Sequence, residues 1–202
     1  MSQFVHLSVH TDHSLVDSVV RVRRLVEAVK SAGMPAVAVT EQGNLFSLVK
    51  FYKAATSAGI KPIVGADIWL ADADHEAPSR LTILCRTQAG YGHLSELLSL
   101  GYRDGQNQGI PLIQADWLEV RREGLIVLAG GVQGEIGRAL VRQKRDQARA
   151  IAAHWQEVFG DAFYLDLQRT GRRQEDVYVD EAVDLAIALD LPVVATNDVR
   201  FL

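Results

Sequence analysis

The chain has 202 residues, of which 48% are hydrophobic, and this is enough to build the core of one domain of ordinary size. Its formal net charge of -4 argues against a protein that holds nucleic acid mainly through its own positive field, because phosphate contacts need clustered Lys and Arg. The single cysteine, Cys85, excludes an intrachain disulfide. Neither a signal peptide nor a membrane-spanning run is evident, so we expect a cytoplasmic protein without a membrane partner.

The first predicted element is a strand over residues 4–10, in which apolar residues alternate with His6, Ser8 and His10. This period of two directs the three polar side chains to one face, close to the end of the strand. Imidazoles with this spacing can converge on a metal ion, and Asp17 in the following loop could add a carboxylate. On these residues alone, ordinary polar side chains at a strand end are the favoured interpretation, and a metal site is the alternative.

Strands alternate with helices along the rest of the chain. A helix is predicted over residues 19–32, capped by Asp17 or Ser18, and a second one is predicted from a cap at Asn44 to residue 58. The further predicted strands are 36–40, 60–70, 81–85, 124–131, 163–167 and 192–195. The further predicted helices are 90–102, 116–120, 133–159 with a break near residue 143, and 174–189. This alternation predicts an α/β fold with a largely parallel sheet, either a closed barrel or an open doubly wound sheet.

Polar residues follow the apolar strands at one recurring place, the carboxyl end of each strand. Parallel α/β folds gather their active sites at this rim, so we expect these side chains to converge. The residues concerned are Ser8, His10, Glu41, Gln42, Asp67, Gly130, Gly131 and Asp198. No glycine-rich phosphate-binding pattern follows any strand, so nucleotide binding of that kind is not expected.

Six segments carry a resemblance to a known family. They are HLSVHT at 6–11, TEQGNL at 40–45, FYKAA at 51–55, GIKPIVGAD at 59–67, EGLIVL at 123–128 and VATNDVRF at 194–201. In order and spacing they resemble the polymerase and histidinol phosphatase (PHP) domain at the N-terminus of bacterial DNA polymerase III alpha subunits, of the replicative gammaproteobacterial type. The resemblance implies a distorted seven-stranded β/α barrel of the PHP type over residues 1–202, and it implies that the domain continues beyond residue 202.

The resemblance also implies which positions correspond to metal ligands. Members of the family with an intact site use about nine His, Asp and Glu ligands to hold up to three metal ions, and they hydrolyse phosphoesters. Four of these positions carry a residue that can still bind a metal: His10, Asp17, Asp67 and Asp198. The other five positions carry a residue that does not act as a metal ligand: Ser8, Gln42, Arg80, Gly131 and Arg200. We therefore expect no metal cofactor and no catalytic residue here, with at most one weakly held divalent ion.

Two of the replacements suggest a physical hypothesis. Three carboxylates without metal ions would repel one another, and Arg80 and Arg200 bring two permanent cations to lost ligand positions. A guanidinium group can satisfy a carboxylate with two hydrogen bonds, so it could stand in for the ions. The hypothesis predicts that both guanidinium groups pair with Asp17, Asp67 or Asp198.

The resemblance implies a scaffold that braces the polymerase core and docks the separate proofreading 3′-5′ exonuclease (epsilon) subunit. Polymerisation and the contact with DNA would belong to the parent chain, whose magnesium-dependent palm domain lies outside these residues. The alternative is a metal-dependent phosphoesterase or pyrophosphatase that uses the residual metal site. A third possibility, an unrelated small-molecule enzyme, lacks an identifiable nucleophile, base and oxyanion site, since the adjacent His13 and Ser14 fit a turn.

Overall fold

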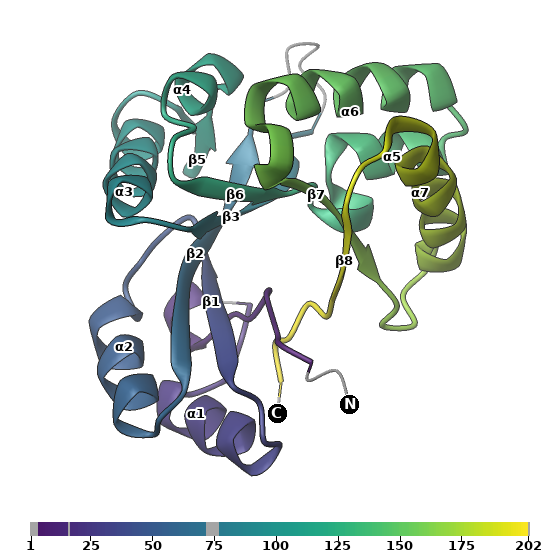
Figure 1. Cartoon of the computed structure of the whole chain (residues 1–202). Helices are drawn as coiled ribbons and strands as arrows, with labels where there is room; N and C mark the ends of the chain where they lie inside the picture. The colour runs from purple at the N-terminus through teal and green to yellow at the C-terminus, as the bar shows by residue number, and fades with distance from the viewer. Residues whose placement is uncertain (1–3, 16, 72–76, 202) are drawn as a thin grey trace.

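The computed structural model of the chain describes residues 4–15, 17–71 and 77–201 (Figure 1). Its strands are β1 (Ala36–Gln42), β2 (Lys61–Leu70), β3 (Ser79–Cys85), β4 (Gln106–Asn107), β5 (Ile110–Ile113), β6 (Leu125–Leu128), β7 (Phe163–Gln168) and β8 (Val193–Thr196). Its α-helices are α1 (Val22–Ser31), α2 (Leu48–Ser57), α3 (Gln88–Arg103), α4 (Ala115–Val120), α5 (Glu135–Val141), α6 (Arg145–Phe159) and α7 (Glu175–Leu189). Among these described helices, none combines the length and the apolarity needed to cross a bilayer.

The sheet is mixed, and the direction of β3 determines what reaches its functional rim. Strands β1 and β2 are parallel, as are β6, β7 and β8, but β3 runs antiparallel to both of its neighbours, β2 and β6. The first residues of β3 therefore lie beside the last residues of β2, with Arg80 opposite Trp69 and Thr82 opposite Asp67. The predicted largely parallel sheet is wrong for β3, and this reversal brings Arg80 to the carboxyl ends of the other strands.

The segment over residues 4–10 lies between β1 and the residues that follow β8, and it closes the ring there. It was predicted to be a regular strand, but it forms one isolated bridge, in which Val9 pairs with Val199. The backbone N of Thr40 donates to Val9 O at 2.9 Å, and the N of His10 donates to Val199 O at 3.0 Å. Together with β1, β2, β3, β6, β7 and β8, this extended segment completes a circuit of the seven-stranded type that the resemblance implies.

Periodicity does not predict the hairpin of β4 and β5. Its turn residues Gln108 and Gly109 both have positive φ, 51° and 83°, as two-residue hairpin turns require. The two paired strands are too short for alternation to be visible in the sequence. The end of β5 then pairs with the end of β2, so the hairpin extends the sheet outside the ring.

Two polar residues that were predicted to cap helices instead fasten the loop after residue 10. Helix α1 begins only at Val22 and has no side-chain cap, while the Ser18 hydroxyl donates to His10 O at 2.7 Å. The Asn44 side chain donates to His13 O at 3.2 Å and accepts from Phe46 N, and α2 begins later, at Leu48. Both residues therefore hold the loop that carries the candidate site.

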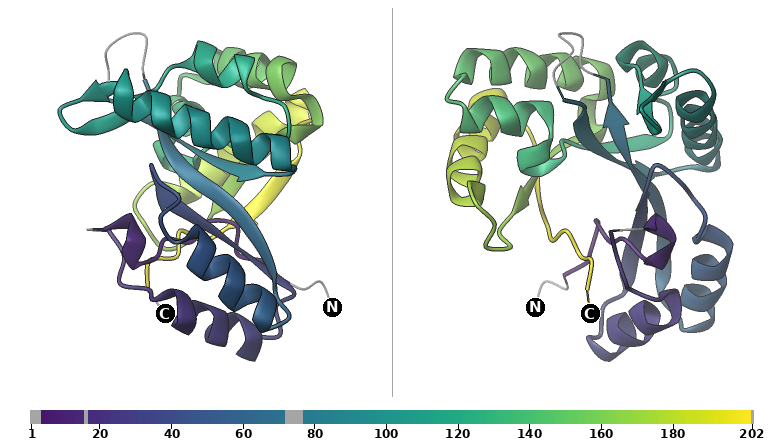
Figure 2. Two further views of the ribbon diagram at one scale, coloured as in Figure 1. Left: turned by 90° about the vertical axis from the view of Figure 1, so that its left-hand side faces the viewer. Right: turned by 180° about the vertical axis from the view of Figure 1, so that it is seen from behind.

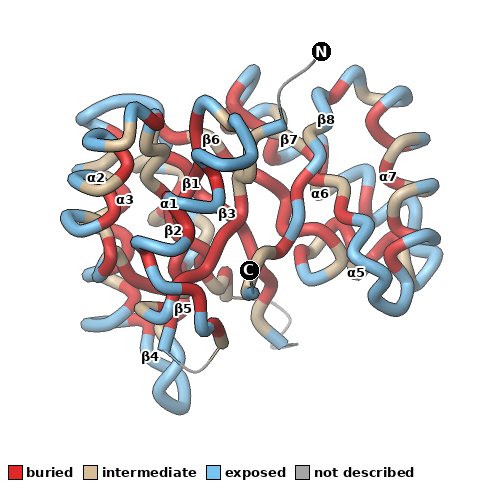
Figure 3. Tube along the Cα trace, turned by 90° about the horizontal axis from the view of Figure 1, so that it is seen from below, coloured by how far each residue is buried: buried red, intermediate tan, exposed pale blue. Residues whose placement is uncertain are grey.

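The helices cover the outside of the sheet and leave its interior polar at one end. One apolar cluster joins β2, β3, β6 and β7 to α3, α5, α6 and α7, and a second joins β1 to α1 and α2. Figure 3 shows buried residues along the central strands and exposed residues around the periphery. Among the described residues, the buried charged side chains inside this ring are His10, Asp67, Arg80, Asp166 and Asp198.

Candidate functional site

His10 lies between two carboxylates at the centre of the site. Its Nδ1 is 2.8 Å from Asp17 Oδ2 and its Nε2 is 2.7 Å from Asp67 Oδ2, and the imidazole is fully buried. Burial alone lowers the pKa of His10, but the hydrogen bond and charge of Asp67 outweigh it, so the pKa lies above its ordinary value. Carboxylate oxygens beside both ring nitrogens favour the imidazolium form, and that form has no lone pair for a metal ion.

Arg80 enters the site from the start of β3 and is only 2% exposed. Its Nε forms an ion pair with Asp67 Oδ2 at 3.1 Å, without the alignment of a hydrogen bond, and its Nη1 lies 3.3 Å from Asp198 Oδ1. The guanidinium group also donates to Ser8 Oγ and to Gln133 Oε1, both at 3.2 Å. A buried cation needs such partners, because desolvation is otherwise very costly.

Both carboxylates beside Arg80 are held in the ionised form. Burial alone raises the pKa of Asp67, but the charge of Arg80 and the hydrogen bond from His10 bring it below its usual value. The same opposition acts on Asp198, where burial raises the pKa and Arg80, Arg200 and Arg172 lower it strongly. The site therefore contains alternating positive and negative charges, and no group of bare carboxylates remains.

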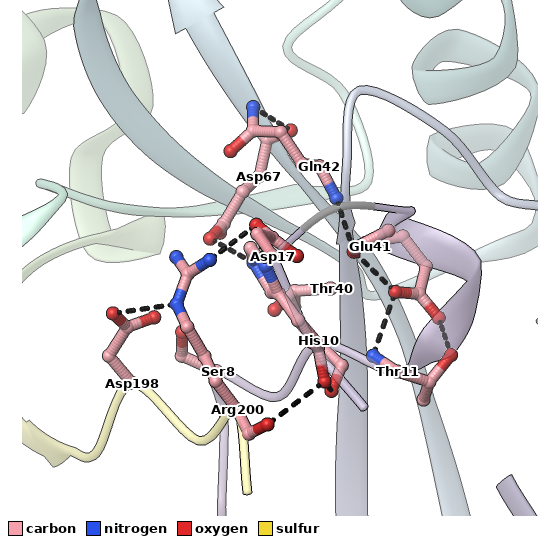
Figure 4. A network of polar contacts seen from close by, with 12 residues as sticks. Ser8, His10, Thr11, Asp17, Thr40, Glu41, Gln42, Asp67, Asp198 and Arg200 are labelled. Atoms are coloured by element: carbon pink, nitrogen blue, oxygen red, sulfur yellow. Dashed lines mark hydrogen bonds and ion pairs between the residues drawn. The ribbon is translucent and has the colours of Figure 1, made fainter. Parts of the chain in front are cut away.

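Arg200 joins the two sides of this charged network. Its Nε donates to Asp198 Oδ2 at 3.1 Å, and its Nη1 forms a close ion pair with Asp17 Oδ2. Figure 4 shows its guanidinium group between these two carboxylates. Arg80 and Arg200 thus both make the carboxylate contacts that the sequence predicted.

Arg172 adds a third guanidinium group, which sequence reasoning did not identify. It lies in the loop between β7 and α7, and its Nη1 donates to Asp198 Oδ2 at 2.5 Å. Half of its side chain is exposed, so it covers Asp198 from the solvent side. No motif includes this loop, and only the tertiary fold brings the two residues together.

The remaining positions without a ligand side chain have other roles. Ser8 is buried and accepts from Arg80, and the Gln42 side chain donates to the backbone O of Asp67 at 3.2 Å. Gly131 has φ of 57°, and a Cβ built on it would lie 3.1 Å from the Gln168 side chain. A side chain at position 131 would therefore need both a strained backbone and a displaced glutamine.

Asp166 is a buried carboxyl group that the sequence analysis missed. Its Oδ1 accepts from Gly131 N at 3.0 Å and its Oδ2 accepts from Gln168 Nε2 at 3.0 Å. Burial raises the pKa of Asp166 to about 6, although the charge of Arg80 opposes this shift. The available signal was a single acidic residue within the otherwise apolar centre of β7, FYLDLQ.

Glu41 holds the loop from which His10 and Asp17 reach the site. The sequence placed it at the rim without a role, and the structure shows its carboxylate buried under residues 11–14. It accepts from Thr11 N at 2.9 Å and from Ser14 Oγ at 2.5 Å, and the Thr11 hydroxyl donates to its other oxygen. Glu41 is thus a positioning residue for the loop (Figure 4).

Within the described part of the chain, one set of side chains could hold a metal ion. His10, Asp67 and Asp198 each offer one ligand atom, and these atoms lie within 4.8 Å of one another. The same carboxylates, however, already pair with Arg80, and both nitrogens of His10 face carboxylate oxygens. A metal ion at this set would therefore compete with Arg80 for the two carboxylates and with Asp17 and Asp67 for His10.

Comparison with known proteins identifies the family. Residues 6–170 match the PHP domain. The chain belongs to the PHP domain family. It is 50% identical over 202 residues to the DNA polymerase III subunit alpha of Pseudomonas fluorescens and 45% identical over 201 residues to that of Escherichia coli K12. These matches cover 100% and 99% of this chain but only 17% of each relative, so this chain spans about a sixth of their length.

Solved structures show the same fold at low sequence identity. One solved structure is a protein from Bifidobacterium adolescentis whose assignment as a metal-dependent phosphoesterase is an inference. It superposes with a TM-score of 0.65 at 14% identity, and the match covers 100% of this chain and 89% of that chain. An amidohydrolase from Chromobacterium violaceum superposes with a TM-score of 0.65 at 12% identity, covering 97% of this chain and 87% of that one. These similarities confirm the predicted PHP-type α/β fold.

Proposed function

We propose that this PHP domain is the N-terminal domain of a replicative DNA polymerase III alpha subunit and that it is a structural, non-catalytic scaffold. The identity to alpha subunits over essentially the whole chain supports the first part of this proposal. The electrostatics of the site support the second part. Polymerisation then belongs to the magnesium-dependent palm domain elsewhere in the parent chain, which also makes the contacts with DNA in the cytoplasm.

The position of Arg80 between Asp67 and Asp198 is the observation that carries the non-catalytic assignment. Phosphoester hydrolysis by this family needs metal ions that activate water and neutralise phosphoryl oxygens. Here a permanent cation already neutralises the two carboxylates, at 3.1 and 3.3 Å. A metal ion would have to displace a buried guanidinium group from both of these carboxylates, which is energetically unfavourable.

The network as a whole serves as an internal brace that replaces the metal cluster. Three guanidinium groups and the His10 imidazolium connect the segment 8–17, β2, β3, the loop after β7 and the segment after β8. Figure 4 shows Asp17, Asp67, Asp198 and Arg200 of this network gathered around His10. A domain braced in this way can support the polymerase core and provide a rigid surface on which the proofreading exonuclease subunit docks.

Two assays on the purified protein test this function. We expect no hydrolysis of bis-p-nitrophenyl phosphate or of pyrophosphate above that of His10→Ala, with manganese or zinc added. We also expect the exonuclease subunit to bind the polypeptide that contains this domain. Metal-dependent hydrolysis that His10→Ala abolishes would overturn the non-catalytic assignment, and failure to bind the exonuclease would overturn the docking role.

The second candidate is a phosphoesterase or pyrophosphatase that retains one metal ion. The convergence of His10, Asp67 and Asp198 within 4.8 Å favours it. Its chemistry would need Arg80 to leave Asp67 and the imidazolium to lose a proton before a ligand lone pair becomes available. The hydrolysis assay above separates the two candidates directly.

A further inference from the structure

The loop between β7 and α7 is fixed at two places. Its residues, 169–174, are all exposed. In Figure 1 and in the right-hand view of Figure 2 the loop extends beyond the end of α7, away from the other helices. Within the described part of the chain, one recorded hydrogen bond of these residues reaches an element other than α7, and it joins Arg172 to Asp198. The second fixed point is Glu175, the first residue of α7.

Glu175 gives the loop its shape from the inside. It is only 3% exposed, and its Oε2 accepts from the backbone N of Thr170 at 2.6 Å and from that of Arg172 at 3.1 Å. Its Oε1 accepts from the Thr170 hydroxyl at 2.7 Å. Burial alone raises the pKa of Glu175, but these hydrogen bonds bring it below its usual value, so the acceptor stays ionised. These contacts do not involve Asp198, so the loop keeps its shape independently of the contact that Arg172 makes.

Two residues of the loop have the backbone conformation of a hinge. Gly171 and Gln174 have φ of 85° and 73°, in the left-handed region. This conformation is strained for glutamine, and such strain persists only where neighbouring contacts hold it in place. The hydrogen bonds of Glu175 supply that restraint at the next position. The base of the loop is thus a place where a change of φ and ψ can move the residues before it as one body.

The contact between Arg172 and Asp198 can break without leaving a bare carboxylate. Asp198 Oδ2 accepts from Arg172 Nη1 at 2.5 Å and from Arg200 Nε at 3.1 Å, while its Oδ1 lies 3.3 Å from Arg80. Two guanidinium groups at one oxygen repel each other, and Arg172 is the most exposed of the three arginines, at 50%. The Asp198 side chain is 1% exposed. Withdrawal of Arg172 would open it to solvent while Arg80 and Arg200 still balance its charge.

We propose that residues 169–174 form a lid, which Glu175 holds in one shape and which swings as a unit to cover or uncover Asp198. The structure shows the closed state, in which Arg172 lies over the carboxylate. In the open state the Arg172 guanidinium group lies in water, and solvent and solutes reach Asp198. The inference goes beyond the proposed function, because it concerns access to the charged network and does not depend on hydrolysis or on a partner subunit.

Carboxyl labelling of the full-length polypeptide tests whether the lid covers Asp198. A water-soluble carbodiimide with glycine ethyl ester modifies carboxylates that solvent reaches, and mass spectrometry of peptides gives the rate at each residue. Arg172→Gln should raise the rate at Asp198 by roughly fivefold, as expected when a half-exposed ion pair is lost. The matched control is Arg173→Gln, the same change at the next residue, for which the described part of the chain records no hydrogen bond or ion pair. It should leave the rate at Asp198 unchanged.

Hydrogen exchange on the same proteins tests whether the lid has a shape of its own. Glu175→Ala removes the acceptor of two lid amides, so the amides of Thr170 and Arg172 should exchange at least about tenfold faster. The labelling of Asp198 should rise in this variant too. Arg172→Gln should leave the exchange of the Thr170 amide unchanged, because Glu175 still holds the lid.

Asp67 reports on the fold as a whole, because it is fully buried and lies in β2, away from the lid. It should stay unlabelled in every variant. If Glu175→Ala labels Asp67, that variant has lost its fold, and Glu175→Gln replaces it. Glutamine keeps one acceptor oxygen, so exchange of the lid amides should then rise by an intermediate amount.

Two results would overturn the proposal. If Asp198 is labelled at the same rate in Arg172→Gln and in the unmodified protein, the lid does not cover it. If Arg172→Gln speeds the exchange of the Thr170 amide as much as the variant at Glu175 does, the loop has no shape of its own and does not move as a unit.

Discussion

Arg80 and Asp198 form a 3.3 Å ion pair across 118 residues of sequence, and both side chains are almost completely buried. The pair links the start of β3 to the segment after β8, so it joins two sides of the ring. Asp67 completes the arrangement from β2. Removing any one member of this group leaves a buried charge without its partner, which is the principle behind the first prediction.

Replacing Arg80 with Leu should strongly destabilise the domain. The change leaves Asp67 and Asp198 buried without their shared cation, and breaking a buried pair in this way costs about 3–5 kcal/mol. Urea unfolding followed by circular dichroism measures the loss. The control is Arg103→Ala, which breaks an exposed 2.6 Å pair with Asp104 and should leave the free energy of unfolding nearly unchanged. Equal effects of the two variants would show that the buried pair has no special role.

Asp166 should make the stability of the domain fall as the solution becomes less acidic. Because burial raises the pKa of Asp166 to about 6, the folded state binds this proton more tightly than the unfolded state does. The stabilising contribution of Asp166 is therefore complete below about pH 4 and is lost as the pH rises through 6. The free energy of unfolding falls over this range by at most about 3 kcal/mol. We expect Asp166→Asn to remove this step.

Urea titration from pH 4 to 8 measures the free energy of unfolding of the unmodified protein and of Asp166→Asn. The difference between the two curves isolates the contribution of Asp166. His10, whose pKa is also raised, contributes to both curves at higher pH, and Asp67 and Asp198, whose pKa values are lowered, contribute to both at lower pH. These terms cancel in the comparison. A difference that does not change between pH 4 and 8 would contradict the assignment.

Gly131→Ala should cost more than the same substitution at Gly33. Both glycines have positive φ, 57° and 67°, so both variants carry a backbone penalty of about 1 kcal/mol. Only Gly131 has a neighbour in the way, since its Cβ would lie 3.1 Å from Gln168, whereas a Cβ at Gly33 meets nothing within 4 Å. The unfolding temperature should fall further in Gly131→Ala than in Gly33→Ala. When Gln168→Ala is added to both variants, their unfolding temperatures should lie closer together. Identical melting shifts would show that Gln168 does not occupy the space.

Glu41→Ala should loosen the loop that carries His10 and Asp17. The change removes the acceptor for the backbone and hydroxyl of Thr11 and for the hydroxyl of Ser14, which should cost at least about 2 kcal/mol. In the variant, the amides of residues 11–18 should exchange faster than in the unmodified protein, and this increase should be larger than any in the core strands. Glu96→Ala, which removes an exposed partner of Arg121, is the control and should leave both quantities nearly unchanged. Unaltered protection of this loop in Glu41→Ala would contradict the positioning role.

The long elements of the fold were predictable because their hydrophobic pattern is strong. The break between α5 and α6, for example, falls where residues 142–144 interrupt the apolar stripe. The direction of β3 was not predictable, because an apolar strand looks the same in either direction. The opening strand was overestimated, since alternation over residues 4–10 reports which face is polar and not how many ladder bonds form.

The members of the site were predictable where motifs align and unpredictable where only the fold brings them together. The contacts of Arg80 and Arg200 followed from the lost ligand positions. Arg172 and Asp166 lie outside every quoted motif, and their contacts with Asp198 and Gly131 depend on loop and strand placement. The role of each lost position as a former metal ligand remains a prediction from the resemblance.

The central claim is that guanidinium groups and one imidazolium balance the carboxylates of this PHP domain in place of a metal cluster. Equilibrium dialysis against manganese or zinc, followed by elemental analysis of the protein and of His10→Ala, tests it most directly. The account predicts at most one ion per chain and an unfolding temperature that a chelator leaves unchanged. Two or more ions per chain, lost in His10→Ala and accompanied by a fall in the unfolding temperature on chelation, would contradict it.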